Sequence, residues 1–130
     1  MKRTSIFPVA ACLVALAACQ SSKPVVGGEN AAAVKMLQHV NESAHTCWIR
    51  SKDKDFVGYS VIPELDTQAG KPRILVVDKK AAHGLPKLVI EADGTPVRAN
   101  AYGPLLSGPA GGRISSDLKR WIGGSSSCTA

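Results

Sequence analysis

The strongest structural signal in this chain is the stretch Glu29–Trp48, which reads ENAAAVKMLQHVNESAHTCW. Its apolar residues recur at alternating intervals of four and three, the spacing that places side chains on one face of a helix. Asn30 precedes this face and belongs to the residue types that cap helix N-termini through a side-chain oxygen. We therefore expect an amphipathic helix that packs on a second layer through Ala33, Leu37, Val40, Ala44 and Cys47.

After this helix the apolar period changes towards two, the period of a β-strand. Four strands are predicted: Asp55–Val61, with Val57, Tyr59 and Val61 on one face, then Arg73–Val77, Lys87–Ala92 and Val97–Tyr102. Asp93-Gly94-Thr95 is typical of a tight hairpin between the last two strands. Because the connections are short, we expect an antiparallel meander.

The C-terminal part of the chain contains a loop and a second helix. Gly103–Gly112 is rich in glycine and proline and is predicted to be a loop, whose Leu105 and Leu106 either enter the core or form an exposed apolar tip. Arg113–Ile122 is predicted to be a short helix capped by Ser115 or Ser116, with Asp117 in its first turn and an apolar face formed by Ile114, Leu118 and Trp121. The whole pattern predicts a two-layer α+β domain, in which an N-terminal helix packs on a four-stranded antiparallel meander sheet and a short helix follows.

The N-terminus has the organisation of an export signal. Lys2 and Arg3 precede the apolar run Ile6–Ala18, which is shorter than the roughly 20 residues of a bilayer-spanning helix. The run ends in Leu16-Ala17-Ala18-Cys19, which resembles the lipobox of bacterial prolipoproteins. The resemblance implies cleavage before Cys19, attachment of a diacylglyceryl group to its thiol and acylation of the new amine. The alternative is an ordinary secretory signal cleaved near Ala18, which would leave Cys19 as a free thiol.

This resemblance divides the chain into three parts. Residues 1–18 are predicted to be a lipoprotein signal peptide, residues 19–29 the lipidated N-terminus and tether, and residues 30–130 a single α+β envelope domain. Two or three acyl chains would give a stable membrane anchor. The residue after Cys19 is Gln20; an Asp at this position would indicate retention in the inner membrane. We therefore expect the protein in the outer membrane, on its periplasmic or its surface face.

The cysteines of the mature chain predict a disulfide. Cys12 leaves with the signal and Cys19 is lipidated, so Cys47 and Cys128 remain. Two remaining thiols in an oxidising compartment usually pair, and this bridge would close a loop of about 80 residues, worth roughly 4 kcal/mol. A metal site is the competing interpretation, but the three histidines have no ligand spacing with either cysteine. We therefore expect no metal.

The charge of the chain is mildly positive. Removal of Lys2 and Arg3 lowers the net charge from +6 to +4, because 14 basic residues then face 10 acidic ones. Such a charge favours an anionic surface, although in sequence the basic residues are scattered among acids. The chain has no basic run with interleaved aromatic residues, so we expect no nucleic-acid partner.

Candidate catalytic residues are sparse. The serines lie outside any G-x-S-x-G motif. The acidic pairs Asp53 with Asp55 and Glu64 with Asp66 are flanked by lysine, proline and glycine, so we interpret them as solvated loop charges rather than paired catalytic carboxylates. The sequence predicts no enzyme and no cofactor.

Two non-catalytic functions remain open. The first is a membrane-anchored cell-envelope lipoprotein with a structural or protein-interaction role, whose partners are the membrane, through the lipid anchor, and another envelope protein. The alternative is a secreted-type inhibitor or small-ligand-binding module tethered to the outer membrane. Trp48 and Trp121 would suit the second as an aromatic platform, but each lies on an apolar stripe, which favours core packing.

Overall fold

A computed structural model of the 130-residue chain describes residues 28–66 and 70–130. The predicted signal peptide, Cys19 and most of the predicted tether therefore lie outside the described residues. The elements in chain order are helix α1 (Gly28–Ala44), the π-helical turn η1 (His45–Arg50), strands β1 (Tyr59–Glu64) and β2 (Arg73–Asp78), the 3₁₀ turn η2 (Lys79–Ala81), strands β3 (Leu88–Asp93) and β4 (Arg98–Tyr102), and helices α2 (Pro104–Ser107) and α3 (Gly111–Ile122).

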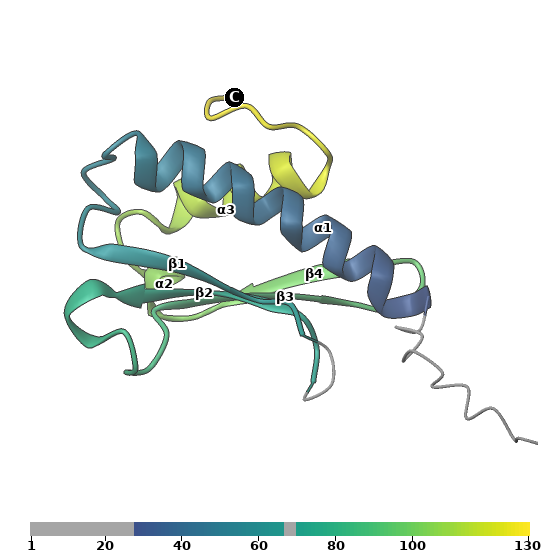
Figure 1. Ribbon diagram of the computed structural model, residues 1–130. Helices are drawn as coiled ribbons and strands as arrows, with labels where there is room; N and C mark the ends of the chain where they lie inside the picture. Colours follow the sequence, from purple (N-terminus) through teal and green to yellow (C-terminus); the bar gives the residue numbers. More distant parts are fainter. Residues whose placement is uncertain (1–27, 67–69) are drawn as a thin grey trace, which may run out of the picture.

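The four strands form one antiparallel sheet in the order β1-β2-β3-β4, which confirms the predicted meander. Figure 1 shows that α1 and α3 cover the same face of this sheet, and the two helices contact each other. No helix of the described chain covers the opposite face (Figure 1). The predicted two-layer α+β fold is therefore correct.

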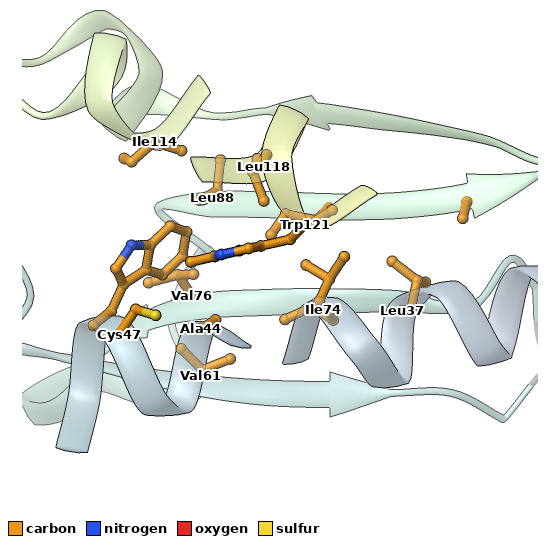
Figure 2. Packing of buried hydrophobic residues seen from close by; sticks show 14 of the residues in the cluster. Leu37, Ala44, Cys47, Val61, Ile74, Val76, Leu88, Ile114, Leu118 and Trp121 are labelled. Carbon is orange, nitrogen blue, oxygen red and sulfur yellow. The ribbon is translucent and has the colours of Figure 1, made fainter. Parts of the chain in front are cut away.

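The hydrophobic core fills the space between the sheet and the two helices (Figure 2). The apolar stripe predicted for the first helix is buried along its whole length, from Ala33 to Cys47. It packs with inward residues of the central strands and with the predicted apolar face of α3. The strand residues at the centre are Ile74, Val76, Leu88 and Ile90, and those of α3 are Ile114, Leu118 and Trp121.

The first helix ends in a π-helical turn, η1, that the sequence pattern did not predict. Because a π-turn contains more residues than an α-turn, neighbouring side chains diverge by a smaller angle and can share a buried face. Cys47 and Trp48 are adjacent in sequence and both are buried. The turn closes with a hydrogen bond of 2.7 Å from Ser51 Oγ to the carbonyl oxygen of Cys47.

The first strand was predicted too early in the chain. The structure has turns before Tyr59, and β1 extends to Glu64. Val57, expected on one face with Tyr59 and Val61, is 64% exposed, whereas Val61 and Phe56 are buried. The reason is a tertiary contact: the Phe56 ring stacks on the Trp48 indole with centroids 4.4 Å apart, which turns the chain before the strand begins.

Both predicted helix caps are also wrong. The first helix begins at Gly28, so Asn30 lies inside its first turn. The last helix begins at Gly111, and the Ser115 and Ser116 hydroxyls instead donate to the carbonyl oxygens four residues before them, at 2.9 and 3.1 Å.

The predicted loop 103–112 contains the short helix α2. Leu105 and Leu106 are partly buried against the core, which decides between the two placements expected for them.

Candidate functional site

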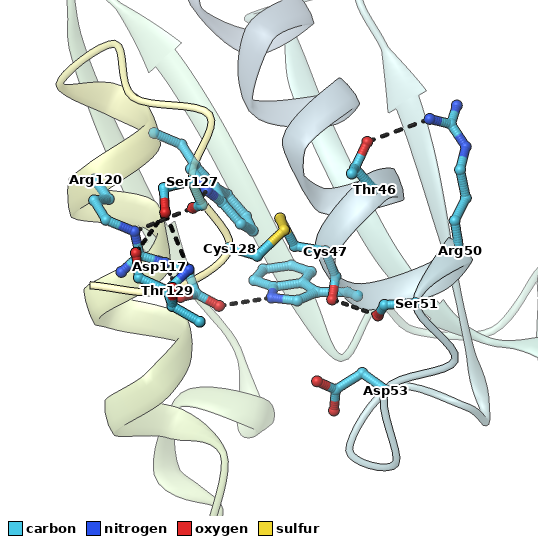
Figure 3. Close-up of a disulfide and its surroundings, with 12 residues drawn as sticks. Thr46, Cys47, Arg50, Ser51, Asp53, Asp117, Arg120, Ser127, Cys128 and Thr129 are labelled. Carbon is cyan, nitrogen blue, oxygen red and sulfur yellow. Dashed lines mark hydrogen bonds and ion pairs between the residues drawn. A yellow bond between two sulfur atoms is a disulfide. The ribbon is translucent and has the colours of Figure 1, made fainter.

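The predicted disulfide joins η1 to the C-terminal tail (Figure 3). The sulfur atoms of Cys47 and Cys128 are 2.00 Å apart and the Cα atoms 5.2 Å apart, across a sequence separation of 81 residues. Cys47 is buried, whereas Cys128 lies on the exposed tail that follows α3. The bridge therefore fastens the tail over the C-terminal end of the α1–η1 segment.

Hydrogen bonds hold the same tail at further points. The carbonyl oxygen of Ser127 accepts from Trp121 Nε1 at 2.9 Å and from Arg120 Nε at 3.2 Å. His39 Nε2 on α1 lies 3.0 Å from the carbonyl oxygen of Ser125. The segment that follows α3 is thus bonded to both helices.

Beneath the tail, the carboxylate of Asp117 connects α3 to η1 (Figure 3). Asp117 is only 3% exposed. Its Oδ2 accepts a hydrogen bond of 2.8 Å from Trp48 Nε1, and its Oδ1 pairs with the Arg120 guanidinium. Arg113, one helical turn earlier, places its Nε 3.5 Å from Oδ2. A buried charge of this kind is tolerated only when it is paired and hydrogen-bonded, and here both oxygens are engaged.

Arg113 extends the network to the loop that precedes β1. Its Nη1 lies 2.5 Å from Asp53 Oδ2 and 3.6 Å from Asp55 Oδ2, and its guanidinium stands 5.8 Å from the centre of the Phe56 ring. Partial burial opposes ionisation of Asp53, but the N–H of Asp55 and the Arg113 guanidinium together hold the pKa of the Asp53 carboxyl below its usual value. Burial likewise opposes the charge on Arg113, yet the hydrogen bond and attraction from Asp53 raise its pKa.

The aromatic residues of the site are packing elements. Trp48 and Trp121 are fully buried, and their ring centroids lie 5.0 Å apart at an interplanar angle of 53°. Trp48 also stacks nearly parallel on Phe56, at 5°. Of the two readings of the tryptophans, core packing is correct, because neither indole presents a face to solvent.

One acid of each predicted acidic pair, Asp53 and Glu64, forms a close ion pair with an arginine. Asp53 retains only 16% of its side-chain exposure beside Arg113. Glu64 Oε2 lies 2.6 Å from Arg73 Nε across the β1–β2 pair. The interpretation as a solvated charge is therefore wrong for Asp53. Glu64 keeps 44% of its side-chain exposure and is solvated, although it lies at the end of β1 and not in a loop.

The chemistry of this network is that of a fold-stabilising cluster. Its carboxylates are engaged by guanidinium and indole donors, and an arginine occupies the position between the three aspartates Asp53, Asp55 and Asp117. Among residues 28–66 and 70–130, no group of three or more His, Cys, Asp or Glu side chains is arranged to hold a metal ion.

Sequence reasoning missed this network, although one signal was available. Arg113, Asp117 and Arg120 are spaced by four and three residues, which places an acid between two bases on one helix face. Asp117 was interpreted as a first-turn charge because the helix was expected to begin at Arg113.

Two grooves flank α3. The first has a volume of about 300 Å³ and lies between α1 and α3, lined by apolar atoms of Ala32, Met36, Trp121 and Ile122 and by Lys35, His39 and Gly124. The second, of about 270 Å³, lies between β4 and α3 and includes Ala99, Asn100, Leu106 and Leu118. The first groove is the more apolar of the two.

Comparisons with protein-family models, with curated proteins and with solved structures find no match. Within the part of the chain that the structure describes, no helix combines the length and apolar content needed to cross a bilayer.

Proposed function

We propose that this protein is a membrane-anchored cell-envelope lipoprotein with a non-catalytic structural or protein-interaction role. The observation that carries the proposal is the Leu16-Ala17-Ala18-Cys19 motif, which is followed after a short segment by one disulfide-closed domain. A disulfide between Cys47 and Cys128 suits the oxidising compartment that such a signal implies. Gln20 favours the outer membrane as the site of anchoring.

The polar network supports a non-catalytic role. Acid–base catalysis requires a group free to exchange a proton with a substrate. Asp117 and Asp53 are instead engaged by arginine side chains, and Asp117 also by the Trp48 indole. The cluster fixes α3, η1 and the tail relative to one another, which is what a rigid presenting domain needs.

The uncovered face of the sheet offers a surface for an envelope partner. Ile62, Leu75, Val89 and Tyr102 are directly opposite one another across the four strands, so they form one apolar row on this face. Val89 is only 8% exposed, so the accessible part of the row consists of Ile62 and Leu75, which are partly exposed, and Tyr102, which is exposed. Charged residues lie in the adjacent row, where Glu64 faces Arg73 and Arg73 faces Glu91. An apolar strip with a charged border is the composition of a protein-interaction surface.

Crosslinking in living cells tests this proposal. A photoreactive amino acid at Leu75 reports on the uncovered face, and the same residue at Gln38, exposed on α1, is the matched control. We expect one dominant envelope protein crosslinked from position 75 and not from position 38. Equal labelling from both positions, or no protein adduct from either, would contradict a protein-interaction role.

The apolar groove favours a second candidate function, binding of a small amphipathic ligand. Met36 and Ile122 line its apolar part, and Lys35 and His39 supply polar groups at the same groove. Native mass spectrometry of the protein purified from cells tests this alternative. A bound small molecule that is lost in Ala32→Phe, which fills the groove, would support it; an unliganded mass for the native protein would exclude it.

A further inference from the structure

Two loops meet at the end of the sheet where β1 begins, at the left of Figure 1. They are residues 51–58 and residues 79–87, and together we call them the basic end. The N–H of Lys79 donates to the carbonyl oxygen of Gly58 at 3.0 Å, and Lys79 Nζ donates to that of Val57 at 2.9 Å. These hydrogen bonds join the two loops, which are far apart in the sequence, into one surface.

The positive charge of the domain is concentrated at the basic end. Residues 28–66 and 70–130 contain 13 basic and 10 acidic side chains. Arg113 and Asp78 contact the basic end and are counted with it. The rest of the described chain then contains seven basic and seven acidic side chains. The net excess of three positive charges therefore lies at the basic end, whose lysines are Lys52, Lys54, Lys79, Lys80 and Lys87.

The acids of this region do not cancel the lysines at its surface. Asp53 and Asp55 turn towards Arg113, at 2.5 and 3.6 Å. Asp78 Oδ1 accepts a hydrogen bond of 2.8 Å from the N–H of Lys80, which caps η2. Asp53 is thus largely enclosed beside Arg113, Asp78 is engaged by η2, and Asp55 keeps 37% of its side-chain exposure, whereas Lys52, Lys54 and Lys80 are exposed.

The same end carries the exposed large apolar side chains of the described chain. Leu85 is 87% exposed in the second loop, Val57 is 64% exposed in the first, and Tyr102 is 46% exposed at the end of β4. Tyr102 belongs to this end because it pairs with Val89 at the start of β3, next to the second loop. Lysines around protruding apolar and aromatic side chains match the chemistry of a bilayer interface, where headgroups are anionic and the layer beneath them is apolar.

We propose that the basic end binds the surface of an anionic phospholipid bilayer. The lysines would contact lipid phosphates, while Leu85 and Val57 would enter the headgroup layer. A soluble polyanion would use the lysines but gives no role to Leu85. The basic end lies at the opposite end of the sheet from the start of α1 (Figure 1).

Vesicle binding by the chain from Ser21 onward, which lacks the lipid, tests the proposal. The buried core cluster runs from Ala33 to Trp121 and the disulfide joins Cys47 to Cys128, so the chain from Ser21 onward contains both. We expect binding to vesicles of phosphatidylglycerol and phosphatidylcholine in equal parts and none to phosphatidylcholine alone. A lysine near an anionic surface contributes about a fivefold gain in affinity, so Lys54→Gln with Lys80→Gln should weaken binding about 25-fold.

The matched control is Lys35→Gln with Lys119→Gln, which removes the same charge from exposed positions on the helical layer. It should weaken binding less than threefold, as expected from distant screened charges alone (about 10 Å Debye length at 0.1 M salt). Equal losses in the two double variants would overturn the proposal, because net charge alone would then explain binding. Circular dichroism and the absence of free thiols confirm that each variant is folded.

Leu85→Ser separates a bilayer from a soluble polyanion. We expect it to weaken vesicle binding while leaving binding to dextran sulfate unchanged. Unchanged vesicle binding in Leu85→Ser, with dextran sulfate bound as tightly as vesicles, would assign the basic end to a soluble polyanion and refute the lipid surface. Neither outcome for Leu85→Ser tests the lipidation of Cys19, because the chain from Ser21 onward does not contain that residue.

Discussion

Substitution of Asp117 tests whether one buried carboxylate holds α3 and η1 together. Removing one partner of a buried ion pair costs about 3–5 kcal/mol, because the other charge and donors are left unsatisfied. Arg120 and Arg113 keep 18% and 36% of their side-chain exposure and can turn to water, which places the expected cost at the lower end. The indole N–H of Trp48 has no such escape, since Trp48 is fully buried. We expect Asp117→Ala to lower the free energy of unfolding by about 3 kcal/mol.

Asp117→Asn separates the hydrogen bond from the charge. The amide oxygen can still accept from Trp48, so the loss should be smaller, about 1–2 kcal/mol. Urea unfolding followed by tryptophan fluorescence measures both values; with a slope of about 1.5 kcal/mol per M, Asp117→Ala shifts the midpoint by about 2 M. Glu42→Gln, in an exposed pair with Arg50, is the control and should leave the midpoint unchanged. Two Asp117 variants within about 0.5 kcal/mol of the wild type would refute this account of the site, since that is the range of ordinary surface substitutions.

Three further predictions concern stability. A Cβ at Gly111 would lie 2.0 Å from a backbone oxygen of α2, whereas a Cβ at Gly112 would meet nothing within 4 Å. In thermal unfolding, Gly111→Ala should therefore destabilise the domain and Gly112→Ala should stabilise it by up to about 1 kcal/mol. The reverse order of stabilities would contradict the packing of α2 on α3. Replacing Cys47 and Cys128 together with Ala should lower stability by roughly 2–4 kcal/mol, and two alkylatable thiols in wild-type protein purified without reductant would disprove the bridge. Because the folded-state pKa of Asp53 is depressed, its ion pair stabilises the fold above the unfolded-state pKa of about 3.9, and this contribution is lost as pH falls through the lower, folded-state value. The stability of Asp53→Asn should therefore fall less steeply with pH than that of the wild type below about pH 4. An unchanged acid transition would show that the pair contributes nothing.

Hydrophobic periodicity was sufficient to predict the architecture. The α1 stripe is buried from Ala33 to Cys47 because residues spaced by four and three share a face whatever the helix packs against. In the last predicted strand, Val97, Ala99 and Ala101 alternate along the chain, and all three are packed against the core. Short connections then left the meander as the simplest topology.

The errors arose where a tertiary contact overrode a local pattern. Alternation placed Val57 on one face with Tyr59 and Val61, but Val57 is exposed and Phe56 is instead buried against Trp48. Hydrophobic periodicity compares residues within one strand, and Trp48 does not belong to the strand predicted around residue 56. Periodicity could therefore not predict this contact. The π-helical turn at Trp48 has the same origin.

The candidate site was only partly predictable. Cysteine counting found the bond between Cys47 and Cys128, because few pairings were possible once the N-terminal cysteines were set aside. The network around Asp117 joins α3, η1 and the loop before β1, so its partners become neighbours only after folding. The basic end follows the same rule, because its two loops, residues 51–58 and 79–87, become neighbours only after folding.

Lipidation at Cys19 is the central claim about this protein, and metabolic labelling with radioactive palmitate tests it most directly. The wild-type chain should incorporate the label, fractionate with the outer membrane and begin at Cys19 by mass spectrometry of its N-terminal peptide. The Cys19→Ser variant should incorporate none, either as an unprocessed precursor or as a chain released by ordinary cleavage. Equal incorporation in both chains, or a wild-type chain that carries a free thiol at Cys19, would contradict the account.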